Sequence, residues 1–231
     1  MRFSATLTGV SGLLMHADDV IKADELARFR KDPSNKTVGV AGDDRSPAWT
    51  WTSYLYYGKN AKGVPVVSFP QTNLAAMLRE AGAQVKLKGN TTFKSLTQSG
   101  ILLEQTMFPF LVNGKEITAE SIADLAGIGD PENSPTFEAQ QASLEKLTGG
   151  AATIDVRRAA VGSSKHVRCR PLFETWSIIV TGEAVDPALT LDVLATIFNI
   201  GGRLKGLGDW RPSARKPGPY GRFVCEVSEL K

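Results

Sequence analysis

Apolar and polar side chains alternate at both ends of this chain. The period of two runs over residues 3–8 and recurs over residues 223–228. Alternation of this kind is typical of a β-strand with one buried face. Because the two patterns match, we predict that strands 3–8 and 223–228 are antiparallel neighbours in one sheet, with Phe223 directed into the core.

Two segments between these strands have helical patterns. In residues 73–81 the apolar positions hold helical spacing, and Gly82 follows them as an end signal. Residues 191–200 are apolar on nearly every side, which indicates a deeply buried helix that Gly201 and Gly202 would end. Both helices need an apolar surface to cover. We therefore expect them on the same face of one sheet.

The remaining strand signals complete a recognisable order. Four further segments predict strands: residues 64–69, 153–157, 166–170 and 173–181. The order strand, helix, strands, helix, strand is typical of an α+β protein with a ferredoxin-like or RRM-like antiparallel sheet and helices on one face.

Two loop-rich stretches interrupt this order. They cover approximately residues 22–63 and 101–150, and we interpret them as insertions in a single domain of residues 1–231. The aromatic patch from Trp49 to Tyr57 is predicted to pack the first insertion onto the body. The second insertion, with its acids and its turn-rich segment from Gly129, is predicted to be partly mobile.

Charge is distributed unevenly. The formal net charge is +3, yet residues 157–170 contain five cations and no acid, and residues 203–222 contain six cations against Asp209 alone. A basic stripe on an otherwise acidic body suggests a polyanionic partner. Solvated charge on an ordinary surface is the alternative interpretation.

The glycine-rich loop, residues 201–222, has the composition of a nucleic-acid-binding segment. Its glycines allow close backbone approach, its amides can form anion-binding concavities, and guanidinium groups match phosphate geometry. A strongly twisted hairpin in which the glycines only make turns is the alternative. The predicted nucleic-acid-binding residues are Arg157, Arg158, Lys165, His166, Arg168, Arg170, Arg203, Lys205, Trp210, Arg211, Arg215, Lys216, Tyr220 and Arg222. Trp210 is the best candidate for stacking on a base.

The sequence favours binding over catalysis. His16 and His166 are the two histidines, and the sequence contains no metal-ligand spacing, no G-x-S-x-G elbow and no phosphate-binding loop motif. We therefore expect no metal, no cofactor and no enzyme activity. His16, beside Asp18 and Asp19, is the weak catalytic candidate, whereas His166 among cations suits a phosphate contact.

The cysteine and hydropathy patterns indicate where in the cell the protein is located. Cys169 and Cys225 form no C-x-x-C motif or disulfide framework, and no apolar run approaches the length of a membrane span. These features predict a cytoplasmic protein that does not bind a membrane.

Three segments resemble the CRISPR-associated RAMP superfamily, especially the backbone subunits that coat guide RNA. They are the strand 3–8 with Gly9 and Leu13–His16, the segment from Val66 to Arg79, and Gly206–Pro212 with Gly218–Phe223. The Gly-Asp-Trp-Arg-Pro core also resembles uncharacterised tailed-phage proteins, which would place the chain in a host cytoplasm. The resemblance implies a single strand gripped through its backbone and a homo-oligomer or head-to-tail array. Gln71-Thr72, the insertion sizes and the Asp-Trp-Arg-Pro core depart from the family pattern, so no CRISPR role follows.

The combined prediction is a non-catalytic, RAMP-like protein that binds single-stranded RNA or DNA and coats it as a repeated array. Two alternatives remain open at this point. One is a metal-independent endoribonuclease that uses His16. The other is a protein-interaction or assembly subunit whose basic stripe contacts an acidic protein.

Overall fold

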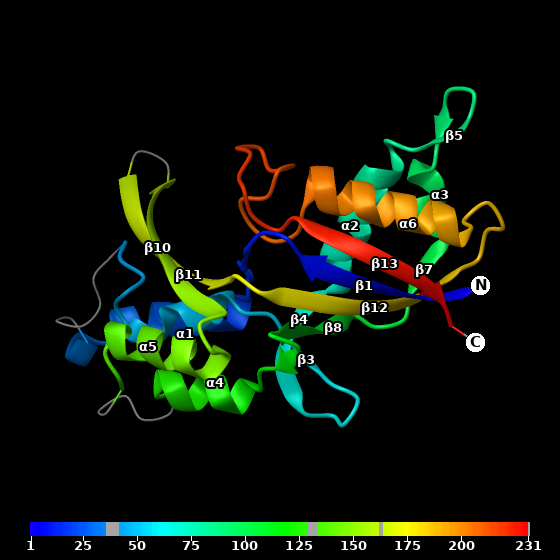
Figure 1. Ribbon diagram of the computed structural model, residues 1–231. Helices are drawn as coiled ribbons and strands as arrows, with labels where there is room; N and C mark the ends of the chain where they lie inside the picture. Colours follow the sequence, from blue (N-terminus) through cyan, green and yellow to red (C-terminus); the bar gives the residue numbers. More distant parts are fainter. Residues whose placement is uncertain (36–41, 129–133, 162–163, 231) are drawn as a thin grey trace.

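The computed structural model describes residues 1–35, 42–128, 134–161 and 164–230. It is an α+β protein with mainly antiparallel sheets (Figure 1). The largest sheet follows the strand order β13-β1-β12-β8-β4-β3, with β7 paired to β12 and β9 paired to β8. Its strands are β1 (Arg2–Gly9), β3 (Tyr57–Lys59), β4 (Pro65–Pro70), β7 (Ile101–Leu103), β8 (Met107–Val112), β9 (Lys115–Glu116), β12 (Trp176–Ala184) and β13 (Phe223–Glu229).

The terminal strands pair as predicted. β1 and β13 are antiparallel neighbours from Phe3 opposite Glu229 to Gly9 opposite Phe223. The alternate residues Phe3, Ala5 and Leu7 are fully buried, and Phe223 is buried beside them. The predicted inward direction of Phe223 is therefore confirmed.

Helices α2 (Gln71–Gly82) and α6 (Leu191–Ile200) lie on the same face of this sheet and contact each other, with α3 (Lys94–Ser99) beside α2 (Figure 1). This arrangement confirms the prediction that helices 73–81 and 191–200 lie on the same face of one sheet. Each helix directs its buried side chains, such as Leu78 and Phe198, into the same core as the inward face of β1.

The α-helix ends at Ile200 with Gly201 as its C-cap, at the predicted position. The helical path does not stop there, because Gly201 keeps right-handed helical dihedrals and a π-helical turn, Gly201–Lys205, follows before Gly206, which has a φ of 71°. A Cβ on Gly201 would collide with Met77, and one on Gly202 would collide with the carbonyl oxygen of Phe223. Gly201 and Gly202 permit close packing, while the positive φ of Gly206, which favours glycine, follows the end of the π-helical turn.

The basic hairpin forms a separate sheet. β10 (Ala152–Val161) pairs with β11 (Ser164–Phe173), which in turn pairs with the short strand β2 (Leu13–Leu14). The predicted strands 153–157 and 166–170 therefore exist, but outside the large sheet, whose middle strands are β12 and β8. The predicted strand 173–181 is divided, because β11 ends at Phe173 and β12 begins at Trp176.

The two segments interpreted as insertions contribute α1 (Val20–Lys31), the 3₁₀ turns Pro33–Asn35 and Ala48–Tyr54, α4 (Ala119–Ala126) and α5 (Phe137–Thr148). These helices gather beside the hairpin, away from α2 and α6 (Figure 1). The second segment also contains β7 and β8 of the large sheet. Its turn-rich part at residues 129–133 lies outside the described residues.

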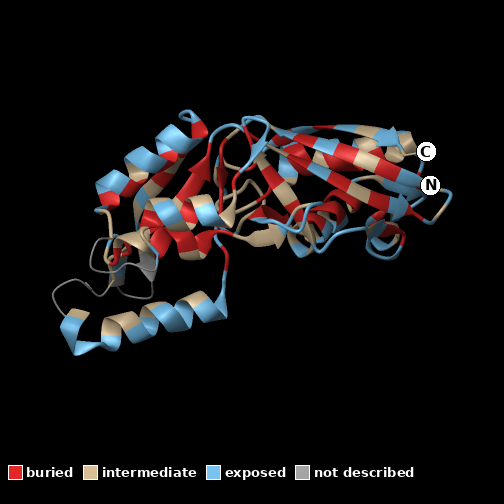
Figure 2. Cartoon of the chain, turned by 90° about the horizontal axis from the view of Figure 1, so that it is seen from below, coloured by how far each residue is buried: buried red, intermediate tan, exposed pale blue. Residues whose placement is uncertain are grey.

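The aromatic patch contacts both the large sheet and the second segment interpreted as an insertion. Tyr56 packs edge to face on Phe69 of β4, whereas the fully buried Trp51 donates through Nε1 to Gln140 Oε1 of α5 at 2.8 Å. By contrast α1 contains no buried residue, and Figure 2 shows it as an exposed arm. The small hairpin of β5 (Lys86–Lys88) and β6 (Thr91–Thr92) extends beyond α3 (Figure 1).

Candidate nucleic-acid interface

Three segments that are far apart in the sequence meet beside the basic hairpin. The glycine-rich loop is tied to the chain between β1 and β2, because Gly221 N donates to Gly12 O at 2.7 Å and Asp209 N donates to Leu14 O at 2.8 Å. The same stretch is tied to β11 through Met15 N, which donates to Pro171 O at 3.0 Å. The loop is thereby fixed against the base of the hairpin.

The loop has a defined backbone that glycine makes possible. Leu207 N donates to Gly221 O at 2.9 Å, and a Cβ on Gly221 would collide with the carbonyl oxygen of Leu207. Gly221 also has a φ of 72°, which favours glycine. A Cβ on Gly218 would likewise collide with the carbonyl oxygen of Trp210.

We expect Gly221→Ala to lower the free energy of unfolding by about 2 kcal/mol, because a left-handed backbone costs a non-glycine residue about 1–2 kcal/mol and the new methyl group has no room. Gly63→Ala is the matched control, since Gly63 has a φ of 78° but a Cβ added to it would meet no heavy atom within 4 Å. It should cost about 1 kcal/mol from backbone strain alone. Urea unfolding compares the two, and equal losses would contradict the tight approach in the loop.

Arg157 connects the hairpin to the aromatic residues of the loop. Its guanidinium carbon lies 4.7 Å from the ring centroid of Trp210 and 5.5 Å from that of Tyr220. It also donates to the Tyr220 hydroxyl and, through Nε, to Asp155 Oδ2 at 2.7 Å. Trp210 and Tyr220 pack edge to face with centroids 5.8 Å apart. Arg157 therefore helps to order the aromatic pair through cation–π and hydrogen-bonding contacts.

Asp209 is the second connection between hairpin and loop. Its carboxylate forms an ion pair with Arg170, lies 3.3 Å from His16 Nδ1, and accepts from the Trp210 amide at 2.8 Å. The hydrogen bond from His16, together with the charge of Arg170 and the Trp210 amide, lowers the pKa of Asp209 to about 2 despite partial burial. The only acid of the loop is therefore held as a carboxylate that faces the hairpin and His16.

Arg168 has an acidic partner of its own. Its Nη1 lies 3.3 Å from Asp44 Oδ2 and donates to the Tyr54 hydroxyl at 3.1 Å. Asp44 is buried, and the Tyr54 hydroxyl donates to it at 2.8 Å. Burial and the charge of Asp44 raise the pKa of Tyr54 to about 12, so the phenol remains a donor.

The hairpin divides the predicted cations between two faces. The pairing of Arg157 with Arg168 and of Asp155 with Arg170 places these side chains on one face, and His166 joins them there through its pairing with Ala159. Arg158 and Lys165 belong to the opposite face by the same register, and both are exposed. The structure thus brings Arg157 and Arg170 to the loop but leaves Arg158 and Lys165 out.

The cations of the loop have no such partner. Within the described part of the chain, no carboxylate lies within 4 Å of the charged groups of the six loop cations: Arg203, Lys205, Arg211, Arg215, Lys216 and Arg222. Arg211 donates to Ser213 Oγ and to Gly208 O, both at 3.1 Å. The loop therefore carries unpaired positive charge beside the hairpin, whose arginines Arg157, Arg168 and Arg170 are engaged with acids.

No protein-family model and no curated protein matches this chain. No helix of the described residues is long and apolar enough to cross a bilayer. Within the same ranges, no three side chains of His, Cys, Asp or Glu are placed to hold a metal ion.

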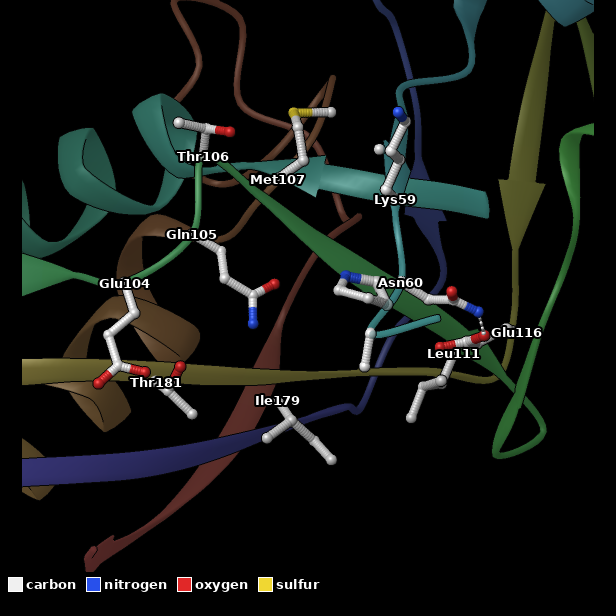
Figure 3. Close-up of a pocket in the computed structure, with 13 residues that line it drawn as sticks. Lys59, Asn60, Glu104, Gln105, Thr106, Met107, Leu111, Glu116, Ile179 and Thr181 are labelled. Atoms are coloured by element: carbon white, nitrogen blue, oxygen red, sulfur yellow. Dashed lines mark hydrogen bonds between the residues drawn. The ribbon is translucent and has the colours of Figure 1, made fainter. Parts of the chain in front are cut away.

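A depression of about 720 Å³ lies elsewhere, along β3, β8 and β12 (Figure 3). Ile179 and Thr181 of β12 and Leu111 of β8 line it, and Asn60 donates to Glu116 at 2.6 Å across one end. None of the predicted binding residues lines this depression, and of the described residues that do, none is a histidine or a cysteine. It is therefore separate from the interface of hairpin and loop.

The side chains that pair with the hairpin arginines were not identified from the sequence, nor was one group of cations. Asp44, Asp155 and Tyr54 were not recognised as partners of arginine, although an acid two residues before Arg157 was a visible signal. Arg79 and Lys94, which lie near Lys205, were also missed.

Proposed function

We propose that this protein binds single-stranded RNA or DNA through the glycine-rich loop, without catalysis. One observation carries the proposal: the single acid of the loop, Asp209, forms an ion pair with Arg170 of the hairpin, whereas none of the six loop cations has a carboxylate partner in the described residues. Unpaired cations on a surface that is fixed in shape are suited to the evenly spaced charges of a phosphodiester backbone.

The aromatic residues of the loop support a single-stranded ligand. Trp210 and Tyr220 are half-buried, so part of each ring is accessible beside the cations. Bases stack on such rings when they are not paired within a duplex. Arg157, already packed against both rings, adds a guanidinium plane to the same stacking surface.

We also propose a ferredoxin-like, RAMP-like architecture as the basis of this function. Its support is the chain order β1, α2, β8, β12, α6, β13 together with the antiparallel sheet order β13-β1-β12-β8. In this scheme β3, β4 and β7 extend the sheet, and the hairpin with α1, α4 and α5 is an addition. The loop between α6 and β13 is then the segment that carries the binding residues. Coating of the strand by repeated copies remains part of the proposal.

Copurifying nucleic acid tests the proposal without a choice of ligand. We expect protein purified at low salt to have a raised A260/A280 ratio, and the nucleic acid to be degraded by a nuclease that accepts single strands. Sensitivity to RNase or to DNase then assigns its chemistry. A ratio typical of pure protein would favour an assembly subunit whose cations contact an acidic protein.

A ribonuclease is the second candidate, because His16 is exposed and its Nδ1 faces the Asp209 carboxylate. A carboxylate that orients an imidazole is a feature of general-base catalysis. The acid expected in this role was Asp18 or Asp19, but Asp19 instead caps α1 by accepting from Ile21 N at 2.9 Å.

We expect His16→Ala to bind single strands within about two-fold of the wild type and to leave any background cleavage unchanged, because the cations of the loop do not include His16. Labelled single-stranded RNA incubated with highly purified protein provides the measurement. Discrete products that the wild type forms and His16→Ala does not would make the ribonuclease the better account.

A further inference from the structure

A second group of cations lies on the helical side of the glycine-rich loop. A depression of about 570 Å³ is lined by Arg79 of α2, Lys94 of α3 and Lys205 of the π-helical turn. Gln84, Gln98 and Glu80 complete its polar lining. Three cations from three different elements thus converge on one hollow, against a single carboxylate.

These cations are available for a ligand. Arg79 and Lys94 are exposed, and in the described ranges none of the three is within 4 Å of a carboxylate. The amide groups of the two glutamines can donate hydrogen bonds to phosphate oxygens. The lining therefore has the chemistry of a site for phosphate groups.

The elements that carry these cations are closely packed. A Cβ on Gly82 would lie 2.7 Å from Thr97 Cγ2, so α2 and α3 are in close contact. A Cβ on Gly201 would collide with Met77, so the π-helical turn is equally close to α2. The three cations are thus presented from a common rigid base, and only their flexible side chains must be ordered when a ligand binds.

The glycine-rich loop connects this hollow to the interface beside the hairpin. A smaller depression, about 70 Å³, is lined by Gly206, Gly208 and Arg211 of the loop and by Glu80, which also lines the larger hollow. Arg211 therefore lies beside α2, and residues 205–210 extend from Lys205 on the helical side to Trp210, which contacts Arg157 of the hairpin. The exposed residues Lys86 and Lys88 of β5 continue the positive charge beyond α3.

We infer that Arg79, Lys94 and Lys205 form a second phosphate site, which holds the backbone of the same nucleic-acid strand after it leaves the hairpin side of the loop. This inference rests on the proposed function. The strand passes along the loop between Trp210 and Lys205, and its length determines whether it reaches the second site.

The test is the effect of strand length on the variant Arg79→Ala/Lys94→Ala. Fluorescence anisotropy is measured with oligonucleotides of about 6 and about 24 nucleotides. The shorter one is within the length that one small single-strand-binding domain usually covers, and the longer one exceeds it. For the longer strand, two lost phosphate contacts should flatten the slope of log affinity against log salt by about 1.4 and weaken binding about 25-fold at about 0.1 M salt. For the shorter strand, affinity should stay within about two-fold.

Lys62→Ala/Lys115→Ala is the matched control, because it also removes two exposed positive charges, one between β3 and β4 and one at the start of β9. It should bind both strands as the wild type does. Arg79→Lys/Lys94→Arg keeps both positive charges, so for the longer strand its slope of log affinity against log salt should equal that of the wild type. Far-UV circular dichroism checks that each variant is folded.

The contradicting results are distinct. Suppose that the wild type binds both strands. If Arg79→Ala/Lys94→Ala binds both with wild-type affinity, or loses the same affinity for both lengths, the second site is overturned while the proposed function stands. If inorganic pyrophosphate binds the wild type, fails to bind the variant, and strand binding is unaffected, the hollow is a site for free phosphate compounds and the inference is overturned. If no oligonucleotide binds the wild type, the proposed function and the second site are both overturned.

Discussion

Asp209→Ala should lower the free energy of unfolding by about 3 kcal/mol, because it leaves the guanidinium of Arg170 without its anionic partner in a largely buried position. The Arg170 side chain is only 12% exposed, and its Nε already has no hydrogen-bond partner among the described residues. For a chain of this size the corresponding fall in Tm is about 6–12 °C. Differential scanning calorimetry gives this value directly.

Asp18→Ala is the control for Asp209→Ala, since Asp18 is an exposed acid in the neighbouring segment. It should change Tm by no more than about 2 °C. Arg170→Ala combined with Asp209→Ala should be less destabilising than the sum of the two single changes, because removing both partners leaves no unpaired charge. A purely additive pair would contradict the role assigned to this contact.

The same contact gives a pH dependence of defined sign. The pKa of Asp209 is lowered to about 2 in the folded protein, below the value of about 3.9 expected in the unfolded chain. The stabilisation is thus complete above about pH 4 and is lost as the pH falls through about 2. The stability difference between the wild type and Asp209→Asn should shrink over this interval in urea unfolding.

Arg215→Ala/Lys216→Ala/Arg222→Ala should weaken binding to single strands about 100-fold at about 0.1 M salt. Each phosphate contact changes the slope of log affinity against log salt by about 0.7, which corresponds to about five-fold in affinity per cation at that salt concentration. All three residues are exposed, so we expect the variant to fold normally. Anisotropy titrations at several salt concentrations give both the affinity and the slope.

Two further variants show whether the loss of affinity for single strands is caused by the loss of the loop cations. Lys62→Ala/Lys115→Ala/Lys146→Ala removes three exposed lysines outside the loop and should bind as the wild type does. Trp210→Ala should lower affinity by an amount nearly independent of salt, because base stacking releases no counterions. If the loop variant and the lysine control lose the same affinity, the loop has no special role in binding.

The sequence predicted those strands whose pattern is local and uninterrupted. β1 and β13 alternate without a break, so their pairing was predictable, whereas β8 was missed because Pro109 interrupts its signal. In the structure β8 pairs with β4 over Met107–Pro109 and with β12 over Phe110–Val112. The proline thus lies where one ladder ends and the other begins.

The helices α4 and α5 were missed because their segment is rich in acids and turn residues, although their caps were visible. Thr118 accepts from Ser121 N, and Gly127 ends α4 in the left-handed conformation. Thr136 and Gly149 do the same for α5. A threonine before the helix and a glycine after it are sequence signals for the two helix ends.

The basic character of the interface was predictable, but its pairing was not. Arg168 and Asp44 are 124 residues apart, and Arg170 and Asp209 are 39 residues apart. No local pattern encodes such contacts, so the sequence could not separate engaged cations from available ones. For the same reason Arg79 and Lys94 gave no signal until the fold placed them near Lys205.

The central claim is that the glycine-rich loop binds the backbone of a single strand, and the salt dependence of wild-type binding tests it most directly. Anisotropy titrations with mixed-sequence single-stranded RNA and DNA should show binding to every sequence, because backbone contacts carry little sequence information. With about five phosphate contacts, log affinity should fall against log salt with a slope of about −3.5. Absence of binding at low salt, even at tens of micromolar protein, where non-specific affinities of about 10⁻⁴–10⁻⁶ M become measurable, would contradict the account.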